Sequence, residues 1–108
     1  MVMQAVLVAL AEPRRREILR LVRDREMLAG EIAARFPEVA RPTVSEHLRV
    51  LRDAGLVVQR REGTRRLYRT RVEGFGEVRA FVDEFWEGRL RALKVEAERE
   101  QRKRNAKR

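Results

Sequence analysis

The segment that ends at Gly55 constrains the fold of this chain most strongly. Its apolar residues recur at i, i+4 and i+7, at Val44, Leu48 and Leu51. That spacing places side chains on one face of a helix. Pro42 suits the first turn of such a helix, and Gly55 is a stop signal just beyond its last residue. The sequence therefore predicts an amphipathic helix from Pro42 to Asp53.

Apolar periodicity and sparse Gly and Pro residues divide the rest of the chain. The expected elements are helices over Met1–Leu10, Pro13–Arg25, Leu28–Phe36 and Pro42–Asp53, a two-stranded hairpin over Leu56–Val72, and a long last helix after Gly74 and Gly76. Two short helices joined by a turn and followed by a hairpin make a winged helix-turn-helix. We expect a mostly α fold with a small β-hairpin, in the order α-α-α-α-β-β-α.

The charge of the chain indicates the kind of partner. Its net charge is +9 and its pI is about 11.3, with 40% of its residues charged. A basic excess of this size fits a polyanion such as nucleic acid. The alternative is a soluble, arginine-rich protein that has no such partner.

Several kinds of chemistry are excluded by what the sequence lacks. It has no cysteine, which rules out disulfides, thiolate metal sites and thiol redox sensing. It has a single histidine and a single serine, too few parts for a catalytic site, so we do not expect an enzyme. No apolar run approaches the roughly 20 residues of a membrane-spanning helix, and the apolar start lacks the features of a signal peptide. By elimination we expect a cytoplasmic protein that does not bind membranes.

The helix over residues 42–53 is the candidate for reading DNA, because the second helix of a helix-turn-helix enters the major groove. N-terminal residues of such a helix reach base edges first. The base-reading candidates are Arg41, Thr43, Ser45 and Glu46. Arginine suits guanine, and glutamate accepts a hydrogen bond from cytosine. The alternative is an ordinary amphipathic helix whose polar side chains face water.

The hairpin favours DNA binding because arginines bracket its turn. They are Arg60, Arg61, Arg65, Arg66, Arg69 and Arg71. Cations so close together repel one another, and a phosphate backbone or a narrow minor groove would relieve that repulsion. The expected backbone or minor-groove contacts are Arg49 on the helix and Arg60, Arg61, Arg65 and Arg66 on the hairpin. The alternative is a charged edge that prevents sheet aggregation.

These segments resemble the ArsR-type winged helix-turn-helix repressors over roughly Ala9–Tyr68. The stretches that carry the resemblance are residues 11–19 (AEPRRREIL), residues 42–57 (PTVSEHLRVLRDAGLV) and residues 60–68 (RREGTRRLY). The resemblance implies a homodimer that blocks promoters and is released by a signal. It also implies that His47 lies close to the DNA backbone. The chain departs from the family pattern at Ala40, where a capping serine is common, and at Glu46, where a basic or neutral residue is frequent.

The last helix is too apolar to face water alone. With the first helix it offers a self-complementary surface for a two-fold dimer. The expected interface residues are Val6, Leu7, Leu10, Phe81, Val82, Phe85, Trp86 and Leu93. The alternative is that this stripe packs within the monomer.

No metal or other cofactor is expected. Near Leu28–Glu31, where many relatives carry cysteine ligands, only Glu31 could bind a metal. Asp83 and Glu87 could hold a hard cation, but Arg79 and Arg91 lie one turn to either side, and helix ion pairs explain these charges better. Any small-molecule or protein effector cannot be identified from the residues.

Residues 1–95 are therefore expected to form a winged helix-turn-helix DNA-binding domain with terminal dimerisation helices. Residues 96–108 have only alanine as an apolar residue, so we expect a charged tail that is frayed or disordered. The expected function is that of a homodimeric, sequence-specific repressor that binds a palindromic operator in double-stranded DNA. The alternatives are a sequence-neutral nucleic-acid-binding protein and a winged-helix adapter for protein; RNA binding is disfavoured because only Tyr68 offers an aromatic ring on the hairpin.

Overall fold

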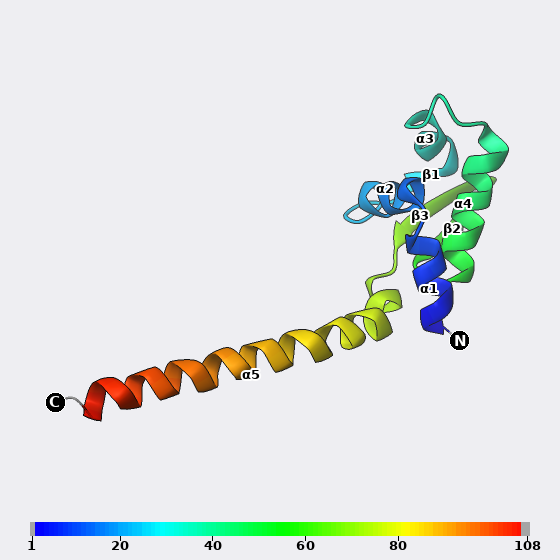
Figure 1. Ribbon diagram of the computed structural model, residues 1–108. Coiled ribbons are helices and arrows are strands. Elements are labelled where there is room, and N and C mark those ends of the chain that lie inside the picture. Colours follow the sequence, from blue (N-terminus) through cyan, green and yellow to red (C-terminus); the bar gives the residue numbers. More distant parts are fainter. Residues whose placement is uncertain (1, 107–108) are drawn as a thin grey trace. The chain divides into compact units, whose positions relative to one another are not determined.

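The computed structural model describes residues 2–106 of the chain. Its elements are helices α1 (Val2–Leu10) and α2 (Pro13–Leu21), strand β1 (Met27–Leu28), helices α3 (Ala29–Ala34) and α4 (Arg41–Asp53), strands β2 (Val57–Glu62) and β3 (Arg65–Thr70), the 3-10 helix η1 (Val72–Phe75) and helix α5 (Gly76–Ala106) (Figure 1). The expected class, mostly α with a small β-hairpin, is confirmed. Met1, Lys107 and Arg108, which the sequence assigned to the first helix and the tail, lie outside the described residues.

Residues up to Val78 form one compact unit, and those from Arg79 onward form a second, which is the greater part of α5. The large apolar side chains of this second unit are exposed. Beyond Val95, where an exposed helix that frays was expected, α5 continues to Ala106. Its last part is rich in alanine, glutamate and arginine, which are strong helix formers. Fraying of the tail from residue 96 onward stays a prediction. No helix among residues 2–106 is long and apolar enough to span a membrane.

The sheet has one strand more than the sequence predicts. Met27 pairs with Tyr68 and Leu28 with Leu67, so β1 adds to the hairpin and the strand order is β1-β3-β2. The predicted helices over 13–25 and 28–36 are accordingly shorter, as α2 and α3. A strand of two residues cannot show an alternating apolar pattern, which is why the sequence did not reveal it.

The core lies against the face of α4 that its apolar spacing predicted. Val44, Leu48 and Leu51 are at most 3% exposed. The other buried side chains are Val6, Ala9, Ile18, Leu19, Val22, Met27, Ile32, Phe36, Ala54, Leu56, Val57 and Tyr68. Val6 is a correction to the expected dimer surface, because α1 packs on α2 and α4 and leaves this side chain only 1% exposed.

The ends of α4 follow from its sequence. Ala40 is the N-cap residue and provides no side-chain hydrogen bond, as the missing serine predicted. At the other end, Gly55 has a φ of 77°, a left-handed conformation that glycine adopts without strain. The Gly55 and Leu56 amides donate to the carbonyls of Arg52 and Leu51, at 3.0 and 2.9 Å. This Schellman motif ends α4 where the sequence predicted.

The junction of α1 and α2 is held by arginines from the following helix. Arg15 Nε donates to the Ala9 carbonyl at 2.8 Å, and Arg16 Nη1 donates to the Leu10 carbonyl at 2.7 Å. The last carbonyls of α1 have no partner within the helix, so these guanidinium groups satisfy and charge-stabilise them. Glu12 caps α2 by accepting from the Arg15 amide at 3.0 Å.

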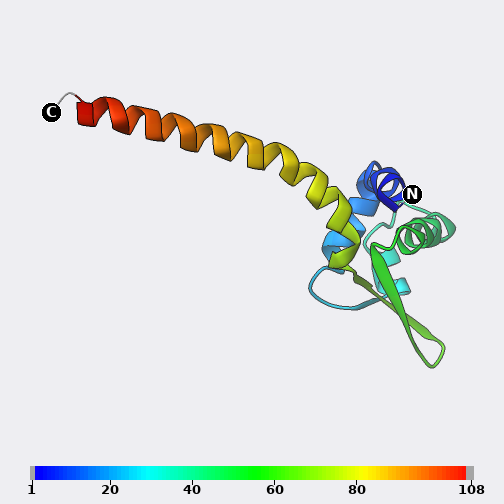
Figure 2. The ribbon, with the colours of Figure 1, turned by 90° about the horizontal axis from the view of Figure 1, so that it is seen from below.

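The tip of the β2–β3 hairpin extends beyond helices α1 to α4, as Figure 2 shows. Val57 pairs with Thr70 at its base and Glu62 with Arg65 beside its turn. Gly63 in the turn has a φ of 64°. At the base, Thr70 Oγ1 donates to the Leu19 carbonyl at 2.8 Å, which ties β3 to α2. The hairpin is therefore anchored at one end, and its arginine-rich tip is free.

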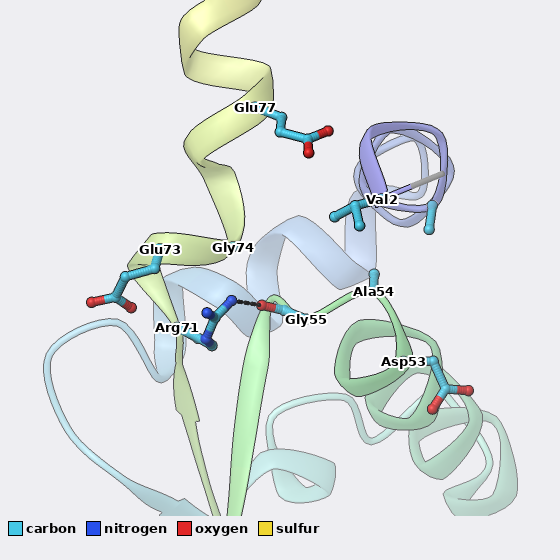
Figure 3. Close-up of a pocket in the computed structure, with 9 residues that line it drawn as sticks. Val2, Asp53, Ala54, Gly55, Arg71, Glu73, Gly74 and Glu77 are labelled. Atoms are coloured by element: carbon cyan, nitrogen blue, oxygen red, sulfur yellow. Dashed lines mark hydrogen bonds between the residues drawn. The ribbon is translucent and has the colours of Figure 1, made fainter.

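The segment after β3 is fixed by a close backbone approach, drawn in Figure 3. Arg71 Nη1 donates to the Gly55 carbonyl at 3.3 Å, and the Arg71 amide donates to Leu56 at 2.8 Å. A Cβ atom at Gly74 would lie 2.2 Å from the Gly55 oxygen. Only glycine at position 74 allows η1 to lie against the end of α4.

Candidate nucleic-acid interface

Helix α4 presents the four base-reading candidates on its N-terminal half. Arg41, Thr43, Ser45 and Glu46 are all exposed, while Val44 and Leu48 face the core. The helix therefore has one face fixed by packing and one polar face open to a ligand. This arrangement agrees with the geometry of a helix that enters the major groove.

Arg49 is engaged by the helix itself. Its Nε donates to Glu46 Oε2 at 3.0 Å, Nη2 donates to Glu46 Oε1, and Nη1 donates to Asp53 Oδ2 at 3.0 Å. The hydrogen bond from Arg49 lowers the pKa of Glu46, and the same bond raises the pKa of Arg49. Arg49 was expected against the DNA backbone. In the structure it holds two carboxylates on the outer face of α4.

His47 does not stand on the outer face of the helix. Its side chain is 12% exposed, and its Nε2 lies 3.8 Å from Glu12 Oε2. Nδ1 is buried and has no hydrogen-bond partner among residues 2–106. The family resemblance implied a position close to the DNA backbone. The side chain lies between α4 and the start of α2.

The wing, which we define as residues 57–70, carries free and paired arginines. Arg60 Nε donates to Glu26 Oε2 at 2.9 Å and its Nη1 donates to Glu62 Oε2 at 3.1 Å. The hydrogen bond to Glu26 raises the pKa of Arg60. Arg61, Arg65 and Arg66 are exposed and have no ion pair within the described part of the chain. The wing tip therefore presents three guanidinium groups that have no ion-pair partner within the described part of the chain, beside one carboxylate, Glu62, that is paired with Arg60.

A hollow of about 260 Å³ lies between α4 and the wing. It is lined by Ala29, Ser45, Leu48, Arg49, Arg52, Arg66 and Tyr68. Arg52 was not among the residues that the sequence predicts to contact DNA. Its spacing of seven residues from Ser45 puts both on one flank of α4, and that spacing was the signal available.

The residues of the expected dimer surface are exposed on α5, but on α1 they differ in exposure. Phe81, Val82, Phe85, Trp86 and Leu93 are between 42% and 66% exposed. The rings of Phe81 and Phe85 contact each other edge to face, with centroids 5.2 Å apart. On α1, Leu7 is 45% exposed and Leu10 is half-buried, whereas Val6 is in the core.

Of the two carboxylates considered for metal binding, Asp83 forms an ion pair with an arginine of the same helix. Arg79 Nε lies 3.5 Å from Asp83 Oδ2, an ion pair of the kind the helix spacing favoured. Among residues 2–106, no three His, Cys, Asp or Glu side chains lie close enough together to hold a metal ion.

Comparisons with known proteins agree with this geometry. Residues 10–60 match the family model of a helix-turn-helix domain. The chain is 42% identical over 78 residues to an HTH-type transcriptional regulator of Mycobacterium tuberculosis, which covers 72% of each chain. It is 38% identical over 61 residues to the transcriptional repressor SdpR of Bacillus subtilis, which covers 56% of this chain and 67% of SdpR.

A solved structure has the same arrangement of elements. It is the homodimeric winged helix-turn-helix DNA-binding domain of a possible ArsR-family transcriptional regulator from Mycobacterium bovis. The TM-score is 0.63 at 35% identity, over 80% of this chain and 79% of that one. The expected winged helix-turn-helix fold is confirmed.

Proposed function

This chain belongs to the ArsR-type family of winged helix-turn-helix transcriptional regulators, and from that membership we propose that it is a homodimeric repressor of a palindromic operator. Helix α4 reads bases, and the wing holds the backbone. The observation that carries the proposal is the exposed polar face of α4 together with three exposed wing arginines, Arg61, Arg65 and Arg66, that have no ion pair among residues 2–106. The proposed function includes no catalytic step and no cofactor. We propose that the protein acts in the cytoplasm.

In this proposal the N-terminal half of α4 recognises base edges in the major groove. Arg41 donates to guanine and Glu46 accepts from cytosine, whereas Thr43 and Ser45 serve either role. Arg49 supports Glu46 by holding its carboxylate in place. A carboxylate has about four lone-pair sites, so Glu46 keeps acceptors for a base while it is bound to Arg49.

The wing contributes affinity with little dependence on sequence. Arg61, Arg65 and Arg66, near the turn, are the wing cations proposed to meet phosphates, and each phosphate that they neutralise releases counterions. Arg69 pairs with Val58 toward the base of the hairpin and is not one of them. Arg65 or Arg66 could also enter a narrow minor groove. In this scheme three further residues support the DNA contacts without touching DNA themselves: Arg60, Arg49 and His47. Ion pairs engage the two arginines, and His47 is largely buried.

Two copies of the chain associate through α5 and α1. The stripe formed by Phe81, Val82, Phe85, Trp86 and Leu93 exposes aromatic and aliphatic area to water in a single protomer. Burial of such area against a second copy is favourable by about 25 cal/mol per Å². Leu7 and Leu10 complete the proposed surface on α1. On a palindromic operator the two half-site centres should then lie about 34–36 Å apart, or a multiple of that.

Selection of bound fragments from random double-stranded DNA tests the proposal. We expect a palindrome with half-sites one helical turn, or a multiple of one turn, apart. Recovery of unrelated fragments would contradict it and would favour a sequence-neutral nucleic-acid-binding protein. The net charge of +9 is the observation that favours this second function. Release of DNA by a small-molecule or protein effector stays a prediction.

A further inference from the structure

The hollow between α4 and the wing has an unusual balance of charge. Its lining includes three guanidinium groups, from Arg49, Arg52 and Arg66, and no carboxylate. Arg49 is neutralised from outside the hollow by Glu46 and Asp53. Neither Arg52 nor Arg66 has an ion-pair partner among residues 2–106. Two cations on different elements therefore face one space without a counter-charge.

The remaining lining supplies the chemistry that an anion would use. The Ser45 hydroxyl is exposed at this flank of α4 and can donate a hydrogen bond. Tyr68 lies beneath, 6% exposed, and its hydroxyl accepts from Gln59 Nε2 at 2.8 Å, which leaves the phenolic proton free to donate. Ala29 and Leu48 provide an apolar floor. A lining with hydroxyl donors, two unpaired cations and no carboxylate fits a ligand made of oxygen acceptors.

We propose that this hollow is a phosphate seat, formed by Ser45, Arg52 and Arg66, that holds one backbone phosphate of double-stranded DNA. The inference rests on the proposed DNA-binding function, adds to it a site and a residue, Arg52, and moves the Ser45 hydroxyl from the base edges to the backbone. The seat joins the helix that reads bases to the wing. A phosphate bound there would fix the distance between the two and thereby the register of α4 in the groove.

The seat assigns different roles to two neighbouring arginines of α4. Arg49 spends three of its donors on carboxylates of its own helix. Arg52 makes no such bond within the described residues, so its guanidinium is available to a phosphate. Arg52 is therefore a direct contact, and Arg49 is a positioning residue.

The first test measures the salt dependence of binding to a scrambled duplex with Arg52→Gln, Arg66→Gln and the control Arg69→Gln. Arg69 is on the same strand as Arg66, is exposed and does not line the hollow. We expect Arg52→Gln and Arg66→Gln each to make the log–log slope shallower, by up to about 0.9 per subunit. Arg69→Gln should leave a slope close to that of the wild type. A slope for Arg52→Gln equal to that of Arg69→Gln would overturn the seat.

The second test locates the phosphate on a selected operator in which single phosphates are replaced by neutral methylphosphonates. One position per half-site should weaken the wild type and Arg69→Gln but have little further effect on Arg52→Gln or Arg66→Gln. If the two variants become insensitive at different positions, a shared seat is excluded. Failure of the proposed function looks different: the wild type then binds operator and scrambled duplex equally, while the slopes of the first test still decide about the seat.

Discussion

At the scale of single residues, the outer face of α4 combines charges that DNA would repel and attract. Glu46 and Asp53 are carboxylates on a surface proposed to face phosphates, and Arg49 lies between them with hydrogen bonds to both. Exposed ion pairs stabilise a fold little. These ion pairs matter because they fix the position of Glu46 and balance its charge. Glu46 is the base-reading candidate at which the chain departs from the family pattern.

Arg49→Gln tests that linkage without DNA. Loss of the Arg49 hydrogen bond should raise the pKa of Glu46 toward that of an unpaired glutamate. Because the pKa is depressed in the folded state, the small stabilisation by this pair exists above the pKa of unfolded glutamate and is lost as the pH falls through the folded value. Carboxyl-carbon NMR titration measures it. Arg52→Gln is the control, and an unchanged pKa in Arg49→Gln would refute the linkage.

How far the sequence predicted the site depended on whether a residue's partner is local. The outward position of Glu46 and the ion pair of Arg79 with Asp83 follow from helix spacing alone. The partner of His47 is Glu12, and that of Arg60 is Glu26, so both contacts exist only after the chain has folded. The same holds for Arg52, whose significance comes from its position near Arg66 on another element.

At the scale of elements, the end of α4 and the start of η1 depend on each other. Gly55 ends the helix in a left-handed conformation, and Gly74 lies directly over its carbonyl. The periodicity predicted the first of these features. It gave no sign of the second, because a close approach between two backbones leaves no local pattern other than the glycine itself.

Gly74→Ala should destabilise the protein by about 1–3 kcal/mol, since its Cβ would overlap the Gly55 carbonyl and force η1 from its place. Chemical denaturation followed by circular dichroism measures the change in free energy of unfolding. Gly76→Ala is the matched control, because a Cβ there meets no atom within 4 Å. Equal stability of the two variants would show that the close approach does not constrain the fold.

At the scale of the whole molecule, the apolar stripe of α5 is the surface that most needs a partner. It consists of Phe81, Val82, Phe85, Trp86 and Leu93. Its large apolar side chains are too many and too close together for a surface that stays in water. The related domain from Mycobacterium bovis is homodimeric. A second copy of this chain is therefore the proposed cover.

Phe85→Glu should convert the dimer to monomers and abolish tight operator binding, since a charge would be buried in the proposed interface. Light scattering at micromolar concentration and a DNA-binding titration measure the two effects. The control is Lys94→Glu, which introduces the same side chain nine residues along α5 and half a turn around the helix from Phe85. A wild-type protein that is monomeric under these conditions would contradict the dimer.

The most direct test of sequence-specific reading by α4 is the ratio of affinities for operator and scrambled DNA at one salt concentration, measured for the wild type, Glu46→Ala and Arg65→Ala. The wild type should prefer the operator. Glu46→Ala should lose about 1–3 kcal/mol of that preference at one base pair, and Arg65→Ala should weaken both duplexes alike. A ratio that survives Glu46→Ala but collapses in Arg65→Ala would reverse the roles of α4 and the wing. A wild-type ratio of one would contradict sequence-specific regulation altogether.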